Sequence, residues 1–466
     1  CRMGSFEPKG WIVPEVELLS KAKKKEDVFR LLTSGSSGGP LANWRKRPAE
    51  ATQVLNSLAK LRWTELALQV LNVMQLGGVE ANVFHYSAAA SACEKSGQWT
   101  WVMHLLGEML EVAVQPNVYT FGSAISCCEK ASRWPEALAL LGTAAGEVNA
   151  FAFSGAISAC KKGHQWQRAL GLLEVMAAAK VQADVVCISG VISACEKCGK
   201  WLAALDLLQS MEEASMKPNL VAQNAALSAC EKAKQWQKAL ILLEQLPEKQ
   251  LTADDVSYNA AISACANSGQ WQVALELLRE MEDRSAPDAV SYSGVILACE
   301  RGSQWQLALQ LSGRMALARV AKDVISCSGL MSACEQGGEW RSTLVLLWQM
   351  PCLTITPNHV TFSSAISACD CGHQWHTALR IFHTMPDKQQ DSFCCNAAIM
   401  ACQKARQWQN ALQTFYLMPS RFAEQDFISY ASAMLAADAG GKWADFSAYC
   451  GVESLLLMNF FRSKSN

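Results

Sequence analysis

Apolar residues follow a helical spacing in two successive stretches of the segment from Asp255 to Asp283. The first stripe consists of Tyr258, Ala261, Ile262 and Cys265, at intervals typical of one face of a helix. The second stripe consists of Trp271, Ala274, Leu275, Leu278 and Met281. Gly269 lies between the stripes, and Gly commonly follows the end of a helix. The pattern predicts two amphipathic helices, one over 258–265 and one over 271–281.

The same two-helix pattern recurs along the chain, and a Trp marks the start of each second stripe. Successive Trp residues are 32 to 36 positions apart. They are Trp63, Trp99, Trp134, Trp166, Trp201, Trp236, Trp271, Trp305, Trp340, Trp375, Trp408 and Trp443. Neither helix of a unit can bury its apolar stripe alone, so neighbouring units must stack. We therefore expect twelve two-helix units of about 35 residues, joined in one solenoid in which the Trp packs in the core.

The repeat accounts for most of the 466 residues, a length that would otherwise fit about three ordinary domains. It divides the chain into an N-terminal extension (1–46), a repeat array (47–461) and a C-terminal tail (462–466). The extension is expected to be partly helical and then a Gly/Ser-rich loop. Its basic stretch Lys21–Lys25 has acidic neighbours, which favours a solvated helix face over a targeting segment. Because the first residue is Cys rather than Met, we expect natural sequence to precede it.

Composition narrows the class of protein. The formal net charge is −1, which excludes a polycationic nucleic-acid packaging protein. Half of the residues are hydrophobic and 18% are charged, so the chain is not a disordered one. No apolar run approaches the roughly 20 residues of a membrane-spanning helix, so we expect no membrane partner.

A Cys lies six residues before ten of the twelve Trp residues, always on the first stripe of its unit. These residues are Cys93, Cys128, Cys160, Cys195, Cys230, Cys265, Cys299, Cys334, Cys369 and Cys402. A thiol at one fixed place in every unit is expected to be a small buried hydrophobe. Disulfides between units are therefore not expected, and a reducing compartment suits so many thiols.

Two series of polar residues recur where packing does not require them. Twelve positions before each Trp stand Ala51, Ser87, Gly122, Ser154, Ser189, Asn224, Asn259, Ser293, Ser328, Ser363, Asn396 and Ala431. Seventeen positions before each later Trp stand Asn82, Asn117, Asn149, Asp184, Asn219, Asp254, Asp288, Asp323, Asn358, Asp391 and Asp426. Helix N-caps also favour Asn and Asp, so capping is an alternative for the second series. Capping does not explain why another polar series, made mainly of Ser and Asn, stands five residues after the Asn/Asp series.

Two further series accompany the polar ones. Two residues after each Asn or Asp of the second series stand the apolar residues Phe84, Tyr119, Phe151, Val186, Val221, Val256, Val290, Ile325, Val360, Phe393 and Ile428. Four residues before seven of the Trp residues stand the basic residues Lys95, Lys130, Lys162, Lys197, Lys232, Arg301 and Lys404. A single-stranded nucleotide needs such parts: a surface for the base face, partners for the base edge and a cation for the phosphate.

The units resemble pentatricopeptide repeats, on the residues ValSerTyrAsnAlaAlaIleSerAlaCys at 256–265, GlyGlnTrp at 269–271 and AlaLeuGluLeuLeu at 274–278. The resemblance implies an all-α fold, a right-handed α-solenoid of stacked helix-turn-helix repeats. It also implies binding of single-stranded RNA, one base per repeat, with the N-terminal repeat toward the 5′ end. Members of this family work mostly in mitochondria and plastids. The constant Trp departs from the usual family pattern, in which an aliphatic residue is commoner at this place.

The polar pairs then predict an RNA sequence. A carboxylate can accept the ring N–H of uracil or guanine, and an amide can match adenine or cytosine. A short Ser leaves room for a purine, and the larger Asn suits a pyrimidine. Repeats two to eleven then read 5′-A-?-G-A-U-U-G-A-G-U-3′, in agreement with the family's code. Gly122 has no side chain, so the base of the third repeat is undetermined, and Ala51 and Ala431 make the terminal repeats caps.

Enzyme motifs are weak in this chain. No zinc-deaminase signature is present, and the Cys195–Cys198 pair has no second pair beside it. One cluster resembles a zinc site and consists of Cys369, Cys371, His373 and His376, but Cys369 belongs to the buried Cys series. We therefore expect no enzyme activity, no catalytic residue, no metal and no cofactor.

The leading hypothesis is a sequence-specific single-stranded RNA-binding protein that acts in organelle RNA processing, stability or translation. Its partners would be single-stranded RNA and other RNA-processing proteins, and its oligomeric state is left open. The alternative is an α-solenoid scaffold for proteins, since similar helical repeats bind peptides. The near-neutral charge is the best support for the scaffold, and the paired Ser/Asn and Asn/Asp series favour RNA.

Overall fold

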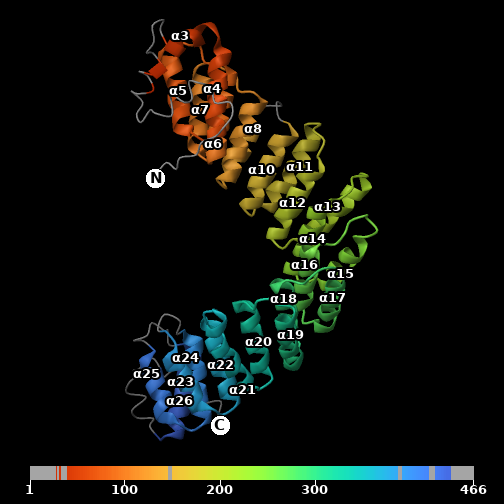
Figure 1. The fold of residues 1–466 in the computed structure, drawn as a ribbon, viewed down its shortest axis with the longest axis vertical. Helices are drawn as coiled ribbons and strands as arrows, with labels where there is room; N and C mark the ends of the chain where they lie inside the picture. The colour runs from red at the N-terminus through yellow and green to blue at the C-terminus, as the bar shows by residue number, and fades with distance from the viewer. Residues whose placement is uncertain are drawn as a thin grey trace, which may run out of the picture. The chain divides into compact units, whose positions relative to one another are not determined.

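In a computed structural model of the chain, regular structure within the described residues is helical (Figure 1). The described residues are 28, 31–32, 39–144, 149–386, 391–418 and 426–441. The helices are α3 (Gly39–Lys46), α4 (Pro48–Leu61), α5 (Thr64–Leu76), α6 (Val83–Ser96), α7 (Trp99–Glu111), α8 (Val118–Lys130), α9 (Trp134–Thr143), α10 (Ala150–Lys162), α11 (Trp166–Ala178), α12 (Val185–Lys197), α13 (Trp201–Glu213), α14 (Leu220–Lys232), α15 (Trp236–Gln245), α16 (Asp255–Asn267), α17 (Trp271–Arg284), α18 (Ala289–Arg301), α19 (Trp305–Leu317), α20 (Val324–Gln336), α21 (Trp340–Gln349), η1 (Pro351–Leu353), α22 (His359–Cys371), α23 (Trp375–Thr384), α24 (Ser392–Lys404), α25 (Trp408–Leu417) and α26 (Phe427–Ala439). The C-terminal tail, Trp443 and most of the N-terminal extension lie outside the described residues.

The chain divides into two compact units, Cys1–Ala229 and Cys230–Asn466. In the first unit, the even-numbered helices α4, α6, α8, α10 and α12 form a row in which each packs on the next. The odd-numbered helices α5 to α13 pack against the even-numbered helices beside them. The second unit repeats this arrangement, with a row from α16 to α26. Each unit is thus a stack of helix-turn-helix repeats, and the all-α solenoid class expected from the sequence is confirmed.

The first helix of each repeat, which has an even number, carries small residues that allow close stacking. In α16, Ala261, Ala264 and Cys265 are fully buried. A Cβ atom added to Gly294 of α18 would lie 2.9 Å from Cγ2 of Ile262, too close for ordinary packing. The α16 and α18 backbones therefore approach each other more closely than larger side chains would permit.

The stripes predicted for this repeat are largely those that the structure buries. Tyr258, Ala261, Ile262 and Cys265 are buried on α16, and Ala274, Leu278 and Met281 are buried on α17. The turn falls at Gly269, whose φ of +70° lies in the left-handed region that Gly adopts without strain. Leu275 was expected in the second stripe but is only partly buried, and Leu277 is buried in its place. Both satisfy a helical spacing, so only the neighbouring helices decide between them.

The sequence predicted that the Trp residues pack in the core of their own repeat, and the structure corrects this prediction. Each member of the Trp series from Trp99 to Trp408 opens the second helix of its repeat and is only partly buried. Where a Gly stands three positions before the next Trp, the indole lies against that Gly at the end of the first helix of the following repeat. A Cβ added to Gly302 would lie 2.4 Å from Cδ1 of Trp271, and one added to Gly372 would lie 2.3 Å from Cδ1 of Trp340. The Trp series therefore fills the seam between adjacent repeats.

The Cys series is buried as predicted. All ten members are free thiols with no exposed surface. Burial raises the pKa of the Cys265 thiol to about 11, so the group stays protonated and unreactive at neutral pH. These thiols therefore serve as small apolar side chains between closely packed helices.

Candidate nucleic-acid interface

The Asn/Asp series caps the first helix of each repeat. In every member from Asn82 to Asp426, a side-chain oxygen accepts a hydrogen bond from the backbone N–H three residues later. Asp288 Oδ1, for example, lies 2.8 Å from the N–H of Ser291. The capping alternative is therefore correct for these residues. A cap uses one side-chain oxygen, which leaves the second carboxylate oxygen or the amide nitrogen for another partner.

The two polar series meet in space although their members are about 30 residues apart. Hydrogen bonds join the members of at least four pairs in the described part of the chain. These are Ser189 Oγ to Asn219 Oδ1 at 3.1 Å, Asn259 Nδ2 to Asp288 Oδ1 at 3.4 Å, Ser293 Oγ to Asp323 Oδ1 at 3.4 Å, and Asn396 Nδ2 to Asp426 Oδ1 at 3.0 Å. The Ser hydroxyls also contact carbonyls of their own helix. Ser189 Oγ lies 2.5 Å from Val185 O and Ser293 Oγ lies 2.6 Å from Ala289 O, while Ser87, Ser328 and Ser363 donate to the carbonyl three residues earlier. The pairing inferred from the repeat period thus corresponds to side chains that lie next to each other.

Hydrogen bonds keep two of the capping carboxyls charged. Burial would raise the pKa of Asp288, but hydrogen bonds from Ser291 and Asn259 outweigh it, and the pKa lies below its ordinary value. The pKa of Asp426 is lowered in the same way, by Ser429 and Asn396 against burial. Both groups are therefore acceptors at neutral pH and can take a proton donor from a ligand.

Apolar side chains stand exposed beside these pairs. Phe84, Tyr119, Phe151, Val186, Val221, Val256, Val290, Ile325, Val360, Phe393 and Ile428 all belong to the exposed large hydrophobic residues. Their exposed fractions run from 40% for Val360 to 78% for Tyr119. Packing within the repeats does not account for apolar groups in water at the same place in every repeat. A row of such groups is typical of a surface that a ligand covers.

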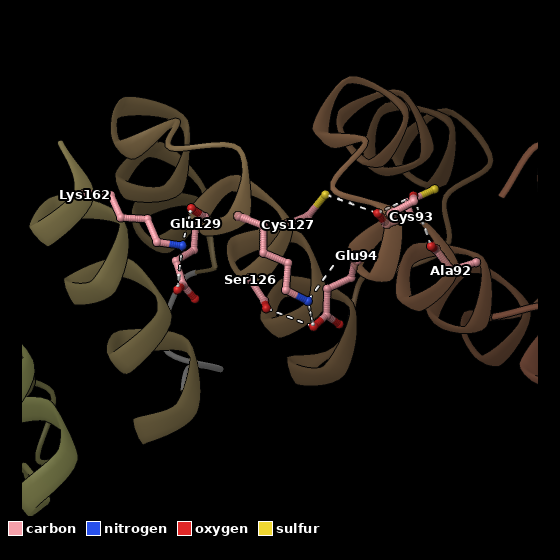
Figure 2. Close-up of polar contacts among 9 residues, drawn as sticks. Ala92, Cys93, Glu94, Ser126, Cys127, Glu129 and Lys162 are labelled. Carbon is pink, nitrogen blue, oxygen red and sulfur yellow. Dashed lines mark hydrogen bonds and ion pairs between the residues drawn. The ribbon is translucent and has the colours of Figure 1, made fainter. Parts of the chain in front are cut away.

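The basic series lies at the other end of the first helices and is tied to the preceding repeat. Figure 2 shows Lys162 reaching Glu129, with Nζ 3.2 Å from Oε1. Lys130 makes the same contact to Glu94 at 3.1 Å, and Lys404 lies 2.6 Å from Asp370. Arg301 instead bonds Asn267 Oδ1 at 2.8 Å. Sequence reasoning missed the acidic partners, although an acidic residue visibly precedes most of these cations along the chain.

These ion pairs limit what the cations offer to a ligand. Lys130 and Lys162 each bond both the carboxylate and the backbone carbonyl of their acidic partner. An ammonium group has three N–H donors, so one donor remains on each. The role of this series in phosphate binding stays a prediction, and any phosphate would share the cation with the protein.

Sequence comparisons agree with this repeated geometry. Three family profiles match the chain: "Pentatricopeptide repeat-containing protein" over residues 51–176, "Pentatricopeptide repeat domain" over 171–233 and "PPR repeat family" over 253–301. The chain belongs to the pentatricopeptide repeat family. No curated protein matches it.

The solved structure of one pentatricopeptide repeat protein shares this fold. The maize protein PPR10 aligns with a TM-score of 0.60 and 18% identity, over 85% of this chain and 57% of that one. PPR10 in complex with an 18-nucleotide psaJ RNA element aligns with a TM-score of 0.47 and 16% identity, over 93% of this chain and 73% of that one. In the first of these alignments, the chain spans little more than half the length of the maize protein.

Two acidic residues of this pentatricopeptide repeat array lack a basic residue at the matching position of the following repeat. Glu300 and Glu335 are followed, one repeat on, by Gln336 and Cys371 at the place of the cations. Burial raises the pKa of both carboxyls above the ordinary value. Hydrogen bonds from Ser364 and Ser367 only partly offset this at Glu335. The charged form is thus disfavoured in the folded state, unlike at Asp288.

We expect Glu335→Gln to stabilise the protein at pH 7 by about 0.5 kcal/mol, because a neutral amide avoids burial of the charge and can still accept from Ser. The folded-state pKa of Glu335 is raised, so the cost of its charge is present above that pKa and disappears as pH falls toward the ordinary pKa. The difference in urea midpoint between variant and wild type should therefore shrink from pH 7 to pH 5.

Glu94→Gln is the matched control for this prediction, since Glu94 has Lys130 as an ion-pair partner. The same substitution there removes a charge pair and should lower stability slightly at pH 7. A Glu335→Gln variant that is less stable than wild type at pH 7 would contradict the interpretation.

The described residues offer neither a metal site nor a membrane-spanning helix. Within residues 39–144, 149–386, 391–418 and 426–441, no three His, Cys, Asp or Glu side chains are placed to hold a metal ion. In the suggested zinc cluster, Cys369 is buried while Cys371 and His373 are exposed. No helix in this described part is both long and apolar enough to cross a bilayer.

Proposed function

We propose that this protein binds single-stranded RNA sequence-specifically, one base per repeat, and acts without catalysis in organelle RNA processing, stability or translation. One observation carries the proposal. Along the row of first helices, hydrogen-bonded polar pairs recur from repeat to repeat beside exposed apolar side chains. A stacking surface next to edge-reading groups is the usual combination in recognition of unpaired bases. Family membership supports the same ligand, and a mitochondrial or plastid location follows the family.

The caps explain how two residue types could distinguish bases. The oxygen that accepts the backbone N–H is held toward the helix, as in Asn358 with Thr361 at 3.0 Å. The other atom is then Nδ2 in Asn, a donor, and Oδ2 in Asp, an acceptor. A donor suits the ring nitrogen of adenine or cytosine, and an acceptor suits the ring N–H of guanine or uracil. Capping and base reading are therefore compatible roles of one side chain.

In the first unit, the second to fifth repeats then read A-?-G-A. In the second unit, the seventh to eleventh repeats read U-G-A-G-U. The sixth repeat, with Asn224 and Asp254, reads U, which gives 5′-A-?-G-A-U-U-G-A-G-U-3′. The apolar series would hold the base faces, and the basic series would contact phosphates.

The test is binding of a ten-nucleotide RNA with this sequence, compared with a shuffled RNA of the same composition and with a duplex form. We expect the designed single strand to bind more tightly than both, because a paired base hides its edge. Equal affinity for the shuffled RNA would contradict base reading. Equal affinity for the duplex would contradict single-strand binding, and failure to bind any RNA would favour the protein-scaffold alternative.

Salt dependence follows from the cation count. Seven basic residues form the series, and each phosphate neutralised on a single strand contributes about −0.7 to the slope of log affinity against log salt. We expect a slope no steeper than about −5, measured by titration between low and moderate salt. A steeper slope would mean that cations outside this series bind the RNA.

A further inference from the structure

One residue of the second helices departs from the repeat pattern and faces solvent. Trp101 lies two residues after Trp99, the first residue of α7, and is 47% exposed. Two positions after the series Trp, the other repeats have Glu65, Glu136, Arg168, Ala203, Lys238, Val273, Leu307, Ser342, Thr377, Asn410 and Asp445. None of these is aromatic, so packing of the repeat does not require an indole at this place. Trp is also a residue type that is enriched where proteins bind partners.

Trp101 borders a hollow of about 340 Å³ between α5 and α7, both of which belong to the first unit. Its apolar lining includes Leu71 and Leu105, which are almost fully buried. Small-ligand sites typically have volumes of about 300–1,000 Å³. The hollow is therefore of a size to take one long side chain of a partner.

The polar residues around this hollow offer hydrogen-bond acceptors and negative charge. Glu65 lines it from α5 and Glu108 lines it from α7. Gln69 also lines it, and its Oε1 is buried without a hydrogen-bond partner among the described residues. The two helices together contain three Glu and no Lys or Arg. Because acceptors without a partner are unfavourable when buried, a ligand that supplies N–H donors and positive charge would be bound favourably.

His104 fixes the aromatic and acidic parts of the hollow next to each other. Its Nδ1 lies 3.3 Å from Oε1 of Glu108, and its ring meets the Trp101 ring edge to face, with centroids 6.2 Å apart. The contact with His104 uses one carboxylate oxygen of Glu108, which leaves Oε2 as an acceptor. An indole and a carboxylate are thus held at neighbouring places along one edge of the hollow.

The apolar surface continues past the hollow, which favours a protein segment over a small cation. Leu76 and Leu110 lie near the C-terminal ends of α5 and α7 and are 71% and 67% exposed. Apolar side chains that flank a basic residue in a peptide would cover these leucines. A free cation makes no such contact.

We infer that this hollow is a docking site for a basic segment of a partner protein, which inserts one arginine side chain beside Trp101 and next to Glu65 and Glu108. A guanidinium group stacks on an indole and donates from five N–H groups, so it matches an aromatic wall with several acceptors. The methylene stem of the arginine would cover the buried leucines of the hollow. An RNA phosphate does not fit, because the two carboxylates would repel it. The inference goes beyond RNA binding and does not depend on it.

The first experiment uses the full chain and three small probes: the capped amino acids N-acetyl-arginine amide, N-acetyl-lysine amide and N-acetyl-citrulline amide. Citrulline has the shape of arginine without its charge. The readout is the indole N–H signal of Trp101 in isotope-labelled protein, identified as the signal that Trp101→Ala lacks. We expect the arginine compound to shift this signal at lower concentration than the lysine compound, and the citrulline compound to leave it in place. No shift with arginine, or an equal shift with lysine or citrulline, would overturn the inference.

The second experiment selects peptides from a displayed random library on the full chain. We expect the selected peptides to carry an arginine with apolar neighbours, and to lose about tenfold in affinity for Trp101→Ala. Glu65→Gln changes an exposed residue and should weaken the same peptides about threefold. A selection without enrichment of arginine, or peptides that bind Trp101→Ala as well as wild type, would overturn the docking site.

Trp348→Ala is the matched control, since Trp348 is 51% exposed on α21, a second helix with no Asp or Glu. This variant should bind the selected peptides like wild type, and thermal unfolding should show that all three variants are folded. Trp101→Ala should also leave the affinity for the ten-nucleotide RNA unchanged. A loss of RNA affinity in that variant would show a nucleotide site and overturn the inference. A protein that binds the arginine peptides but no RNA would contradict only the proposed function.

Discussion

Asn259→Ser is expected to change the preferred base at the seventh repeat from U to G. Asp288 stays in place as the acceptor, and the shorter Ser leaves room for a purine. The new pair would match Ser293 and Asp323, whose side chains are 3.4 Å apart, the same distance as Asn259 Nδ2 to Asp288 Oδ1. The measurement is the affinity of both proteins for two RNAs that differ only at that base. A mismatch typically costs about 1–3 kcal/mol, so each protein should prefer its own RNA by roughly tenfold to a hundredfold.

The control for this prediction is Asn267→Ser, the same substitution at the other end of α16. Asn267 Oδ1 accepts from Arg301 at 2.8 Å and does not belong to either reader series. Any loss of affinity there should be equal for the two RNAs. Asn259 also accepts a hydrogen bond from Ser291 at 2.7 Å, so a small loss of stability is expected in the test variant. An equal loss on both RNAs for Asn259→Ser would mean that the residue only supports the helix.

Gly302→Val is expected to destabilise the second unit by about 1–3 kcal/mol, the usual cost of overpacking. Even the Cβ would lie 2.4 Å from Cδ1 of Trp271, so the indole must move out of its position between the two repeats. Because each repeat mainly contacts its neighbours, the loss should begin locally. Hydrogen exchange should show faster exchange in α17 and α18 before the rest of the unit.

Gly313→Val is the matched control, since a Cβ there meets nothing within 4 Å. It lies within α19, where Val forms a helix more readily than Gly, so it should leave stability unchanged or slightly raised. Gly302→Ala should be milder than Gly302→Val, because Ala131 and Ala405 occupy the corresponding place in other repeats. A Gly302→Val protein as stable as the Gly313→Val protein would show that the Trp seam contributes little.

Much of the candidate site could be predicted because its parts recur with the repeat. Asn396 and Asp426 were paired by their positions relative to successive Trp residues, and their side chains lie 3.0 Å apart. The exposed apolar series was also visible as a recurring position. The acidic partners of the cations were not found, because a pair such as Lys130 and Glu94 belongs to different repeats and depends on how closely two helices stack. The same limit applies to Gly122, whose neighbour Phe151 comes from the first helix of the following repeat.

By itself, the sequence determined the period, the two helices of each repeat, the buried Cys and the family. These depend on spacing within a helix and on side-chain size, which are local properties of the chain. Tertiary structure decided that the capping oxygen is turned toward the helix, that Trp271 fills a seam rather than a core, and that Lys162 is already paired with Glu129. The cap contact joins residues only three positions apart, whereas the Trp271 and Lys162 contacts depend on distances between helices about 35 residues apart, which are set by the packing of whole repeats.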